Sequence, residues 1–188
     1  MLNKVKERVS AAIKPIAGSM VALGLSPNHV TIIGFALSLT SAYAFFSSSA
    51  QLGGILLLLA GLFDVLDGAV ARISGRVTKW GGVLDSTLDR YSDIAIISGI
   101  ILGGLCDAFW GLLSIMGSVM VSYVRARGEV EGVKLSSVGL MERAERMVLI
   151  AVSALVGYTW AGIVLLAILT NITVCQRLVR VRASLRGL

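Results

Sequence analysis

Residues 64–89 read DVLDGAVARISGRVTKWGGVLDSTLD. Four carboxylates of this stretch lie inside hydrophobic segments that are long enough to cross a bilayer, namely Asp64, Asp67, Asp85 and Asp89. A carboxylate at the centre of a membrane costs about 2.5–3.5 kcal/mol even on the more permissive insertion scales. Of the four basic residues nearby, two are expected at helix ends, so the chain's own cations cannot pair with every carboxylate. We therefore expect divalent metal ions as partners.

The composition is that of an integral membrane protein. Of 188 residues, 56% are hydrophobic and only 15% are charged, and the mean hydropathy is +0.85. Soluble domains carry about 25% charged residues. The net charge of +6 would suggest nucleic acid as the partner of a soluble protein. Here the basic residues follow the positive-inside rule, so we expect a lipid bilayer as the partner and no nucleic acid.

The distribution of basic residues predicts the topology. Lys and Arg gather before, between and after the apolar segments, whereas the stretches 47–54, 106–107 and 157–162 contain none. An even number of crossings follows, with both termini and the four aspartates toward the cytoplasmic side. A crossing needs about 20 residues. We place six of them at 28–48, 52–75, 82–105, 108–127, 143–160 and 162–184.

The segment before the first crossing predicts an amphipathic helix. Apolar residues recur at helical spacing over residues 3–23, so this helix lies in the membrane interface or packs on the bundle. Gly24 ends it, and Ser26, Pro27 and Asn28 start the next helix. No cleavable signal is expected. The predicted fold is all-α and forms one membrane domain over 1–188, with an amphipathic helix in 1–25 and six transmembrane helices in 26–188.

The cysteines and several isolated polar residues are given structural roles. Cys106 and Cys175 are expected in the core near opposite membrane faces, without a disulfide. His29 is expected in the interface, and Asp107 in a solvated loop. The glycines at 99 and 103 permit close helix contact, for which packing within the chain is a better explanation than dimerisation.

The spacing of the aspartates predicts a shared metal site. Asp64 and Asp67 are three residues apart on one helix face, and Asp85 and Asp89 are four apart on the next helix. Because these helices run in opposite directions, both pairs fall in the same half of the membrane. Oxygen ligands without a nearby His or Cys favour Mg²⁺, Mn²⁺ or Ca²⁺ over zinc. Two such ions would suit phosphoryl transfer.

The same residues resemble a known family. The spacing Asp64-x2-Asp67-Gly68-x2-Ala71-Arg72-x8-Gly81-x3-Asp85-x3-Asp89 is similar at every fixed position to the signature of the CDP-alcohol phosphotransferases. The resemblance implies that an acceptor hydroxyl attacks the lipid-linked phosphate of a CDP-lipid and releases CMP. It also implies that the four aspartates bind two divalent cations, Mg²⁺ or Mn²⁺, that Asp89 is the general base, and that the enzyme is a homodimer.

The resemblance also assigns a site for the donor. Contacts to the cytidine diphosphate portion of the CDP-lipid are implied for Gly68, Ala71, Arg72 and Gly81. Asn28 and Thr31 belong to a Pro-Asn-x-x-Thr sequence that commonly opens the first helix in such enzymes. They border the same site or serve as helix-cap residues.

A second cluster, of arginines, bears on the acceptor. The predicted topology alone explains some of these arginines, because basic residues gather at cytoplasmic helix ends. The sequence ERAER at 142–146, however, is an unusual start for an apolar helix. Gly139, just before it, would let a ligand approach. Guanidinium groups bind phosphate in a bidentate manner, so the acceptor is expected to be phosphorylated. The candidates are Arg125, Arg127, Arg143, Arg146 and Arg177, with Arg146 and Arg177 preferred.

The stretches SYVRARGEVEG (122–132) and GLMERAER (139–146) resemble the corresponding region of the phosphatidylinositol-phosphate synthases. This likeness implies inositol 1-phosphate as the acceptor and CDP-diacylglycerol or CDP-archaeol as the donor. Glycerol 3-phosphate is the nearest rival acceptor, and the arginines alone do not separate the two.

Two other classes of protein also fit part of the pattern. The aspartates would suit the permeation site of a divalent-cation transporter, or they would pair with arginines in a purely structural membrane protein. One further aspartate, Asp93, continues the stripe of Asp85 and Asp89 but lies outside the signature. We expect it to contact a metal ligand or a nearby cation.

Overall fold

The described part of the chain, residues 13–136 and 138–186 of a computed structural model, is helical and contains no strand. A helix over Ile13–Ala22 comes first. Six longer elements follow: α2 (Pro27–Phe46), α3 (Ala50–Ser74), α4 (Lys79–Leu102), α5 (Ala108–Val130), α6 (Arg143–Leu155) and α7 (Thr159–Leu185). The all-α prediction and the order of the six helices are confirmed. Residues 1–12 of the predicted amphipathic helix lie outside the described residues.

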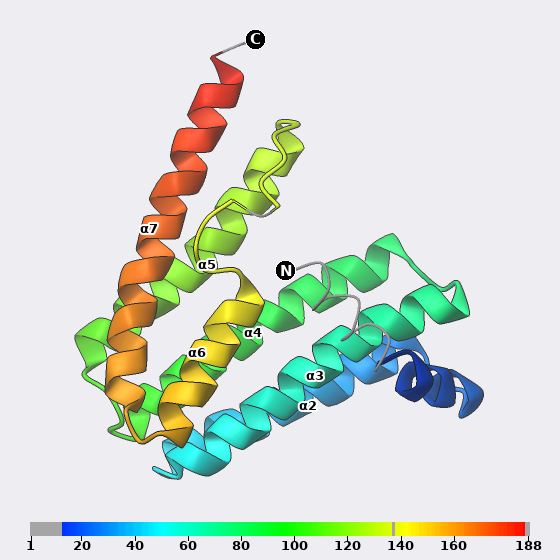
Figure 1. Ribbon diagram of the computed structural model, residues 1–188, viewed down its shortest axis with the longest axis horizontal. Coiled ribbons are helices and arrows are strands. Elements are labelled where there is room, and N and C mark those ends of the chain that lie inside the picture. Colours follow the sequence, from blue (N-terminus) through cyan, green and yellow to red (C-terminus); the bar gives the residue numbers. More distant parts are fainter. Residues whose placement is uncertain (1–12, 137, 187–188) are drawn as a thin grey trace.

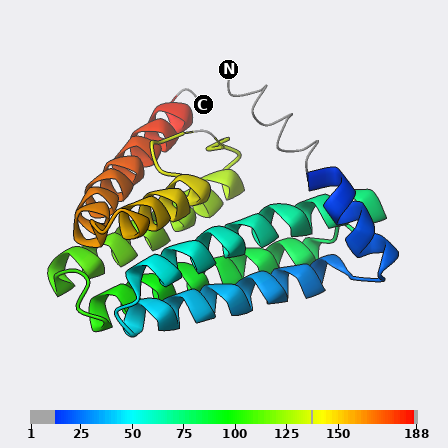
Figure 2. The same ribbon diagram turned by 60° about the horizontal axis from the view of Figure 1, so that its bottom comes forward.

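The helices pack as a closed ring. Helix α2 packs on both α3 and α4, α3 packs on α6, α6 on α7, α7 on α5, and α5 on α4 (Figures 1 and 2). Although α3 and α4 are adjacent in sequence, each makes its main contacts with α2 rather than with the other. Side chains of α3 and α4 meet inside the ring, next to α2.

The two ends of the bundle differ. At one end the short connections from α2 to α3, α4 to α5 and α6 to α7 lie close together, and the helices converge there (Figure 1). These connections carry no Lys or Arg. At the opposite end the helices spread apart, and the basic residues flank that end. The basic residues thus lie at one end of the bundle, as their distribution along the sequence predicts.

Local chemistry sets the helix boundaries. The Ser26 hydroxyl accepts a hydrogen bond from the His29 N–H, and the His29 ring accepts one from the Ser26 N–H, which makes a reciprocal cap at the start of α2. Gly24 and Gly75 end the preceding helix and α3 with φ of +78° and +66°. Asp107, expected as a solvated loop residue, is exposed and caps α5 by accepting from the Phe109 N–H at 2.8 Å.

Four helices, α2, α3, α5 and α7, are long and apolar enough to cross a membrane. Helix α4 has 24 residues but carries several charged side chains. Helix α6 has only 13 residues, which is about 20 Å and less than the roughly 30 Å of a bilayer's hydrocarbon layer. The predicted crossing at 143–160 is therefore too long. The helix ends at Leu155, and Gly157, with φ of +84°, turns the chain into α7.

The cysteine prediction is half right. Both thiols are free, as expected, and Cys106 packs against the main core cluster. Cys175 is exposed, so its placement in the core was wrong. Thr173 and Arg177 are the buried positions of this part of α7. A residue two positions away lies about 200° around the helix, which puts Cys175 on the outer face.

Two glycines allow α4 to approach α2 closely. A Cβ on Gly99 would collide with the carbonyl oxygen of Ala42, and one on Gly103 with that of Phe45. The contact lies within one chain, as the sequence indicated. It sets the depth at which α4 lies along α2, and hence the height of the α4 aspartates, which lie about two to four turns before Gly99.

We predict that Gly99→Ala destabilises the fold, because a methyl group there meets backbone rather than a flexible side chain. Overpacking of this kind costs about 1–3 kcal/mol. Gly18→Ala is the matched control: nothing lies within 4 Å of its Cβ position, so the better helix propensity of Ala should leave stability equal or slightly raised. Thermal unfolding in detergent measures both, and equal melting temperatures would contradict the prediction.

Candidate active site

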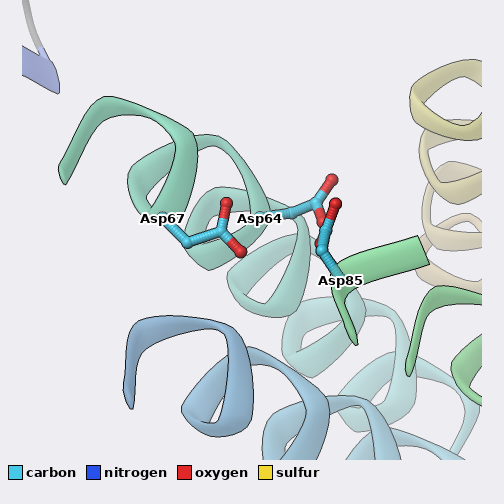
Figure 3. A group of neighbouring side chains, drawn as sticks. All are labelled: Asp64, Asp67 and Asp85. Atoms are coloured by element: carbon cyan, nitrogen blue, oxygen red, sulfur yellow. The ribbon is translucent and has the colours of Figure 1, made fainter. Parts of the chain in front are cut away.

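Three carboxylates meet inside the ring. Asp64 and Asp67 come from α3 and Asp85 from α4, and one oxygen of each lies within 4.8 Å of the others. Figure 3 shows the three side chains directed into a common space. The two residues between Asp64 and Asp67 place both on one helix face, and the turn at 75–78 returns the chain so that Asp85 comes level with them.

The surroundings of these carboxylates fit a small, hard cation. Oδ1 of Asp85 is buried and has no hydrogen-bond partner among the described residues. A cavity of about 10 Å³ is lined by the three carboxylates together with Thr31, Asp89 and Arg143, and this is about the space of one water molecule. An all-oxygen donor set beside an unsatisfied carboxylate oxygen is suited to Mg²⁺ or Mn²⁺.

Thr31 orients one of the carboxylates. Its hydroxyl donates to Oδ2 of Asp67 at 2.7 Å, from the first turns of α2. The resemblance placed Thr31 at the nucleotide. In the structure it also supports a candidate metal ligand, a role that such outer hydrogen bonds commonly fill.

Asp89 lies one turn beyond Asp85 and outside the group of three. Its Oδ1 is 2.9 Å from Nη1 of Arg143, and its Oδ2 is 3.3 Å from Nη1 of Arg90. The same Arg143 nitrogen is 2.5 Å from Oδ1 of Asp64. Arg143, predicted for the acceptor phosphate, therefore bridges carboxylates of α3 and α4.

A second pocket, of about 170 Å³, adjoins the carboxylates. Asp67 and Asp85 lie in its wall, and five of the six predicted donor contacts line it: Asn28, Thr31, Gly68, Ala71 and Gly81. The sixth, Arg72, is not in the wall. Its guanidinium lies along Gly68, where an added Cβ would be 3.3 Å from Nη1.

Sequence reasoning missed part of this wall, namely Pro27, Arg76, Val77, Thr78 and Gly82. The variable positions between Arg72 and Gly81 carry no family signal. Thr78 was recognisable as a helix cap, since its hydroxyl accepts from the Gly81 N–H at 3.0 Å.

The predicted acceptor arginines separate into three groups, of which the first is Arg143 at the carboxylates. Arg146 and Arg177 are each only 2% exposed. On the outer part of α5, Arg125 pairs with Glu129 at 2.9 Å and Arg127 with Glu131. Arg125 and Arg146 are within electrostatic range of Arg177, whereas Arg127 is 56% exposed and directed outward.

Helix α7 fixes the chain that leads into α6. The Thr173 hydroxyl accepts from the N–H groups of Leu140 and Met141, at 3.1 and 3.2 Å. Arg177 donates through Nε to the Val138 carbonyl at 2.9 Å and through Nη1 to the Val121 carbonyl at 2.6 Å. These bonds determine where α6 begins.

The expected space beside Gly139 is filled. Its φ of +109° suits glycine, but a Cβ there would collide with the Thr173 side chain. The glycine serves the packing of the loop on α7, and the expectation of a ligand against it was wrong.

Clustered carboxylates that suit a divalent cation, next to a pocket in a bundle of apolar helices, are typical of a metal-dependent membrane enzyme. Residues 24–179 match the CDP-alcohol phosphatidyltransferase family. The chain belongs to this family, and it is an integral membrane transferase of phospholipid synthesis. Membership excludes the transporter and the purely structural protein.

Named relatives extend the likeness over nearly the whole chain. An archaetidylinositol phosphate synthase of Pyrococcus horikoshii is 41% identical over 98% of this chain and 98% of its own. A phosphatidylinositol phosphate synthase of Mycobacteroides abscessus is 34% identical over 95% of this chain and 87% of its own.

Crystal structures of the phosphatidylinositol phosphate synthase of Mycobacterium tuberculosis, 33% identical, have the same fold. The structure with CDP-DAG bound has a TM-score of 0.80 and covers 90% of this chain and 92% of its own. The structure in complex with manganese and citrate has a TM-score of 0.81 and covers 90% and 88%.

We predict that Asp85→Asn weakens Mn²⁺ binding at least about tenfold, because the amide removes one charge and one of the converging oxygens. Asp107→Asn is the matched control, since Asn caps a helix as well as Asp does. Titration of Mn²⁺ by electron paramagnetic resonance measures both affinities. An Asp85→Asn protein with wild-type affinity would show that Asp85 is not a ligand.

Proposed function

We propose that this enzyme transfers the phosphatidyl or archaetidyl group of a CDP-lipid to the hydroxyl of inositol 1-phosphate, releasing CMP, with two divalent cations. One observation carries the proposal. Asp67 and Asp85 line both the ion-sized cavity and the larger pocket bounded by Gly68 and Gly81. A pyrophosphate held in that pocket would lie beside the carboxylates.

In the proposed reaction, the acceptor oxygen forms a bond to the lipid-linked phosphorus while the bond from this phosphorus to the pyrophosphate bridging oxygen breaks. The hydroxyl proton passes to Asp89, and CMP leaves. Asp64, Asp67 and Asp85, with Asp89, would hold the cations. When bound, the cations neutralise the pyrophosphate and the charge that develops during transfer. Asn28, Thr31, Gly68, Ala71 and Gly81 form the donor pocket, with Arg72 beside Gly68.

The acceptor is assigned from the arginines. Arg146 and Arg177 are buried guanidinium groups close enough to influence each other electrostatically. Two buried cations favour an anionic ligand beside them. Arg125 also acts on Arg177, but its partner Glu129 offsets its charge. Among phosphorylated alcohols, inositol 1-phosphate is favoured over glycerol 3-phosphate because the named relatives are inositol phosphate synthases.

The donor lipid follows from the same relatives. Identity is 41% and 42% to two archaetidylinositol phosphate synthases, compared with 34% to a third and with 34% and 37% to two phosphatidylinositol phosphate synthases. This favours CDP-archaeol over CDP-diacylglycerol.

We expect purified protein with CDP-archaeol or CDP-diacylglycerol and Mn²⁺ to release CMP when inositol 1-phosphate is added, because only a phosphorylated acceptor uses the arginines. Unphosphorylated inositol should give little release, and EDTA should abolish it. Chromatography of CMP provides the measurement. Release with glycerol 3-phosphate but not with inositol 1-phosphate would overturn the assigned acceptor.

The same assay tests the proposed base with Asp89→Asn, which removes it. General-base catalysis contributes about 10²–10⁴-fold, so CMP release should fall at least a hundredfold while the protein stays folded by circular dichroism. Asp107→Asn should retain wild-type release.

We also propose that all six helices α2–α7 lie in the membrane and that the basic end, with the active site and both termini, faces the cytoplasm. The charge asymmetry between the two ends supports this orientation.

The orientation predicts thiol accessibility. In a variant with both natural cysteines replaced by Ser, Gln51→Cys lies at the end without basic residues and Lys134→Cys at the basic end, and both positions are exposed. A membrane-impermeant maleimide added to intact cells should label Gln51→Cys and should label Lys134→Cys only after permeabilisation. The reverse pattern would invert the topology.

A further inference from the structure

We propose that Asp93 is a positioning residue that fixes Arg146, so that the acceptor phosphate is bound in place for attack. The inference rests on the function proposed above. Asp93 lies outside the family signature, one turn beyond Asp89 on α4.

The contacts of Asp93 point entirely toward α6. Its Oδ2 accepts from Nη2 of Arg146 at 2.7 Å, and its Oδ1 lies 3.9 Å from Nε of Arg143. Asp93 is 8% exposed and Arg146 is 2% exposed. A buried carboxylate thus faces two guanidinium groups that stand one turn apart at the start of α6.

These contacts join helices that are not main packing partners. Helix α6 packs on α3 and α7, and α4 packs on α2 and α5. The pairs from Asp89 to Arg143 and from Asp93 to Arg146 span the interior of the ring between them. The positions of both arginines relative to the carboxylate site therefore depend on α4 side chains.

Arg146 has little else to hold it. Among the described residues, Asp93 is the hydrogen-bond partner of its guanidinium, and its Nε is buried without one. Ser118 Oγ is likewise buried without a partner, and it lines with Asp93 and Arg146 a cavity of about 10 Å³. Without the Asp93 charge, the guanidinium would have another orientation available, toward this cavity.

Asp93 also makes the pocket selective. Two arginines without a carboxylate would attract many anions, whereas the Asp93 carboxylate occupies one edge of Arg146 and repels a phosphate from that side. The remaining edge is left for the ligand. Asp93 is therefore expected to affect the affinity for the acceptor and not the affinity for the CDP-lipid or for the cations.

The test is Asp93→Asn, which keeps the shape and an accepting oxygen but removes the charge. We expect the KM for inositol 1-phosphate to rise about tenfold or more, while the KM for the CDP-lipid and the Mn²⁺ concentration at half activation change less than about threefold. Asp93→Glu should recover part of the acceptor affinity. Asp107→Asn serves as the matched control and should change none of these values.

A double-variant cycle separates positioning from a general structural role. If Asp93 acts through Arg146, adding Asp93→Asn to Arg146→Lys should raise the acceptor KM much less than it does in the wild type. Independent, additive effects would overturn the proposal, as would equal changes in the three kinetic constants. If Asp93→Asn fails to fold, Asp93→Glu is tested in its place. Its KM for inositol 1-phosphate should rise more than its KM for the CDP-lipid or its Mn²⁺ concentration at half activation.

The outcomes also distinguish this proposal from the function on which it rests. A wild-type enzyme that uses glycerol 3-phosphate instead overturns the named acceptor, and Asp93 is then judged by its effect on the KM for glycerol 3-phosphate. A wild-type enzyme whose CMP release responds to neither phosphorylated alcohol overturns both.

Discussion

The rest of the structure depends on one electrostatic constraint: carboxylates in a bundle of apolar helices must have positive partners. Arg143 reaches from α6 to Asp64 on α3 and to Asp89 on α4. The group of Asp64, Asp67 and Asp85 keeps an unsatisfied oxygen that suits a metal ion. The charged interior therefore specifies both a ligand and the placement of α6 relative to α4, with which it makes few contacts.

The ring arrangement makes this possible. Helix α2 packs on both α3 and α4, whereas α3 and α4 make few contacts with each other, so short side chains from both can share a small space beside α2. Close approach is confined to the contact of α4 with α2, where Gly99 and Gly103 permit it. Thr31 on α2 donates a hydrogen bond to Asp67, so α2 also orients one of the carboxylates.

Features set by local spacing could be predicted from the sequence, and those set by tertiary geometry could not. The interval from Asp64 to Asp67 fixes a helix face, and the charge pattern orders six helices. Nothing local indicates that Arg143 points to the carboxylates while Arg146 pairs with Asp93, because that depends on how α6 crosses the ring. Hydropathy also continued the fifth crossing past Gly157, since a left-handed glycine breaks a helix without changing its apolar character.

The shortness of α6 has a consequence for where the substrates meet. With 13 residues it spans about 20 Å of a hydrocarbon layer of roughly 30 Å. Its end at Leu155 is tied to the converging end of the bundle, so the missing length falls at the Arg143 end. In the proposed orientation, the Arg143 end of α6 therefore lies about 10 Å below the level of the lipid headgroups. A water-soluble acceptor would therefore descend into the membrane to reach a donor whose acyl or isoprenoid chains never leave it.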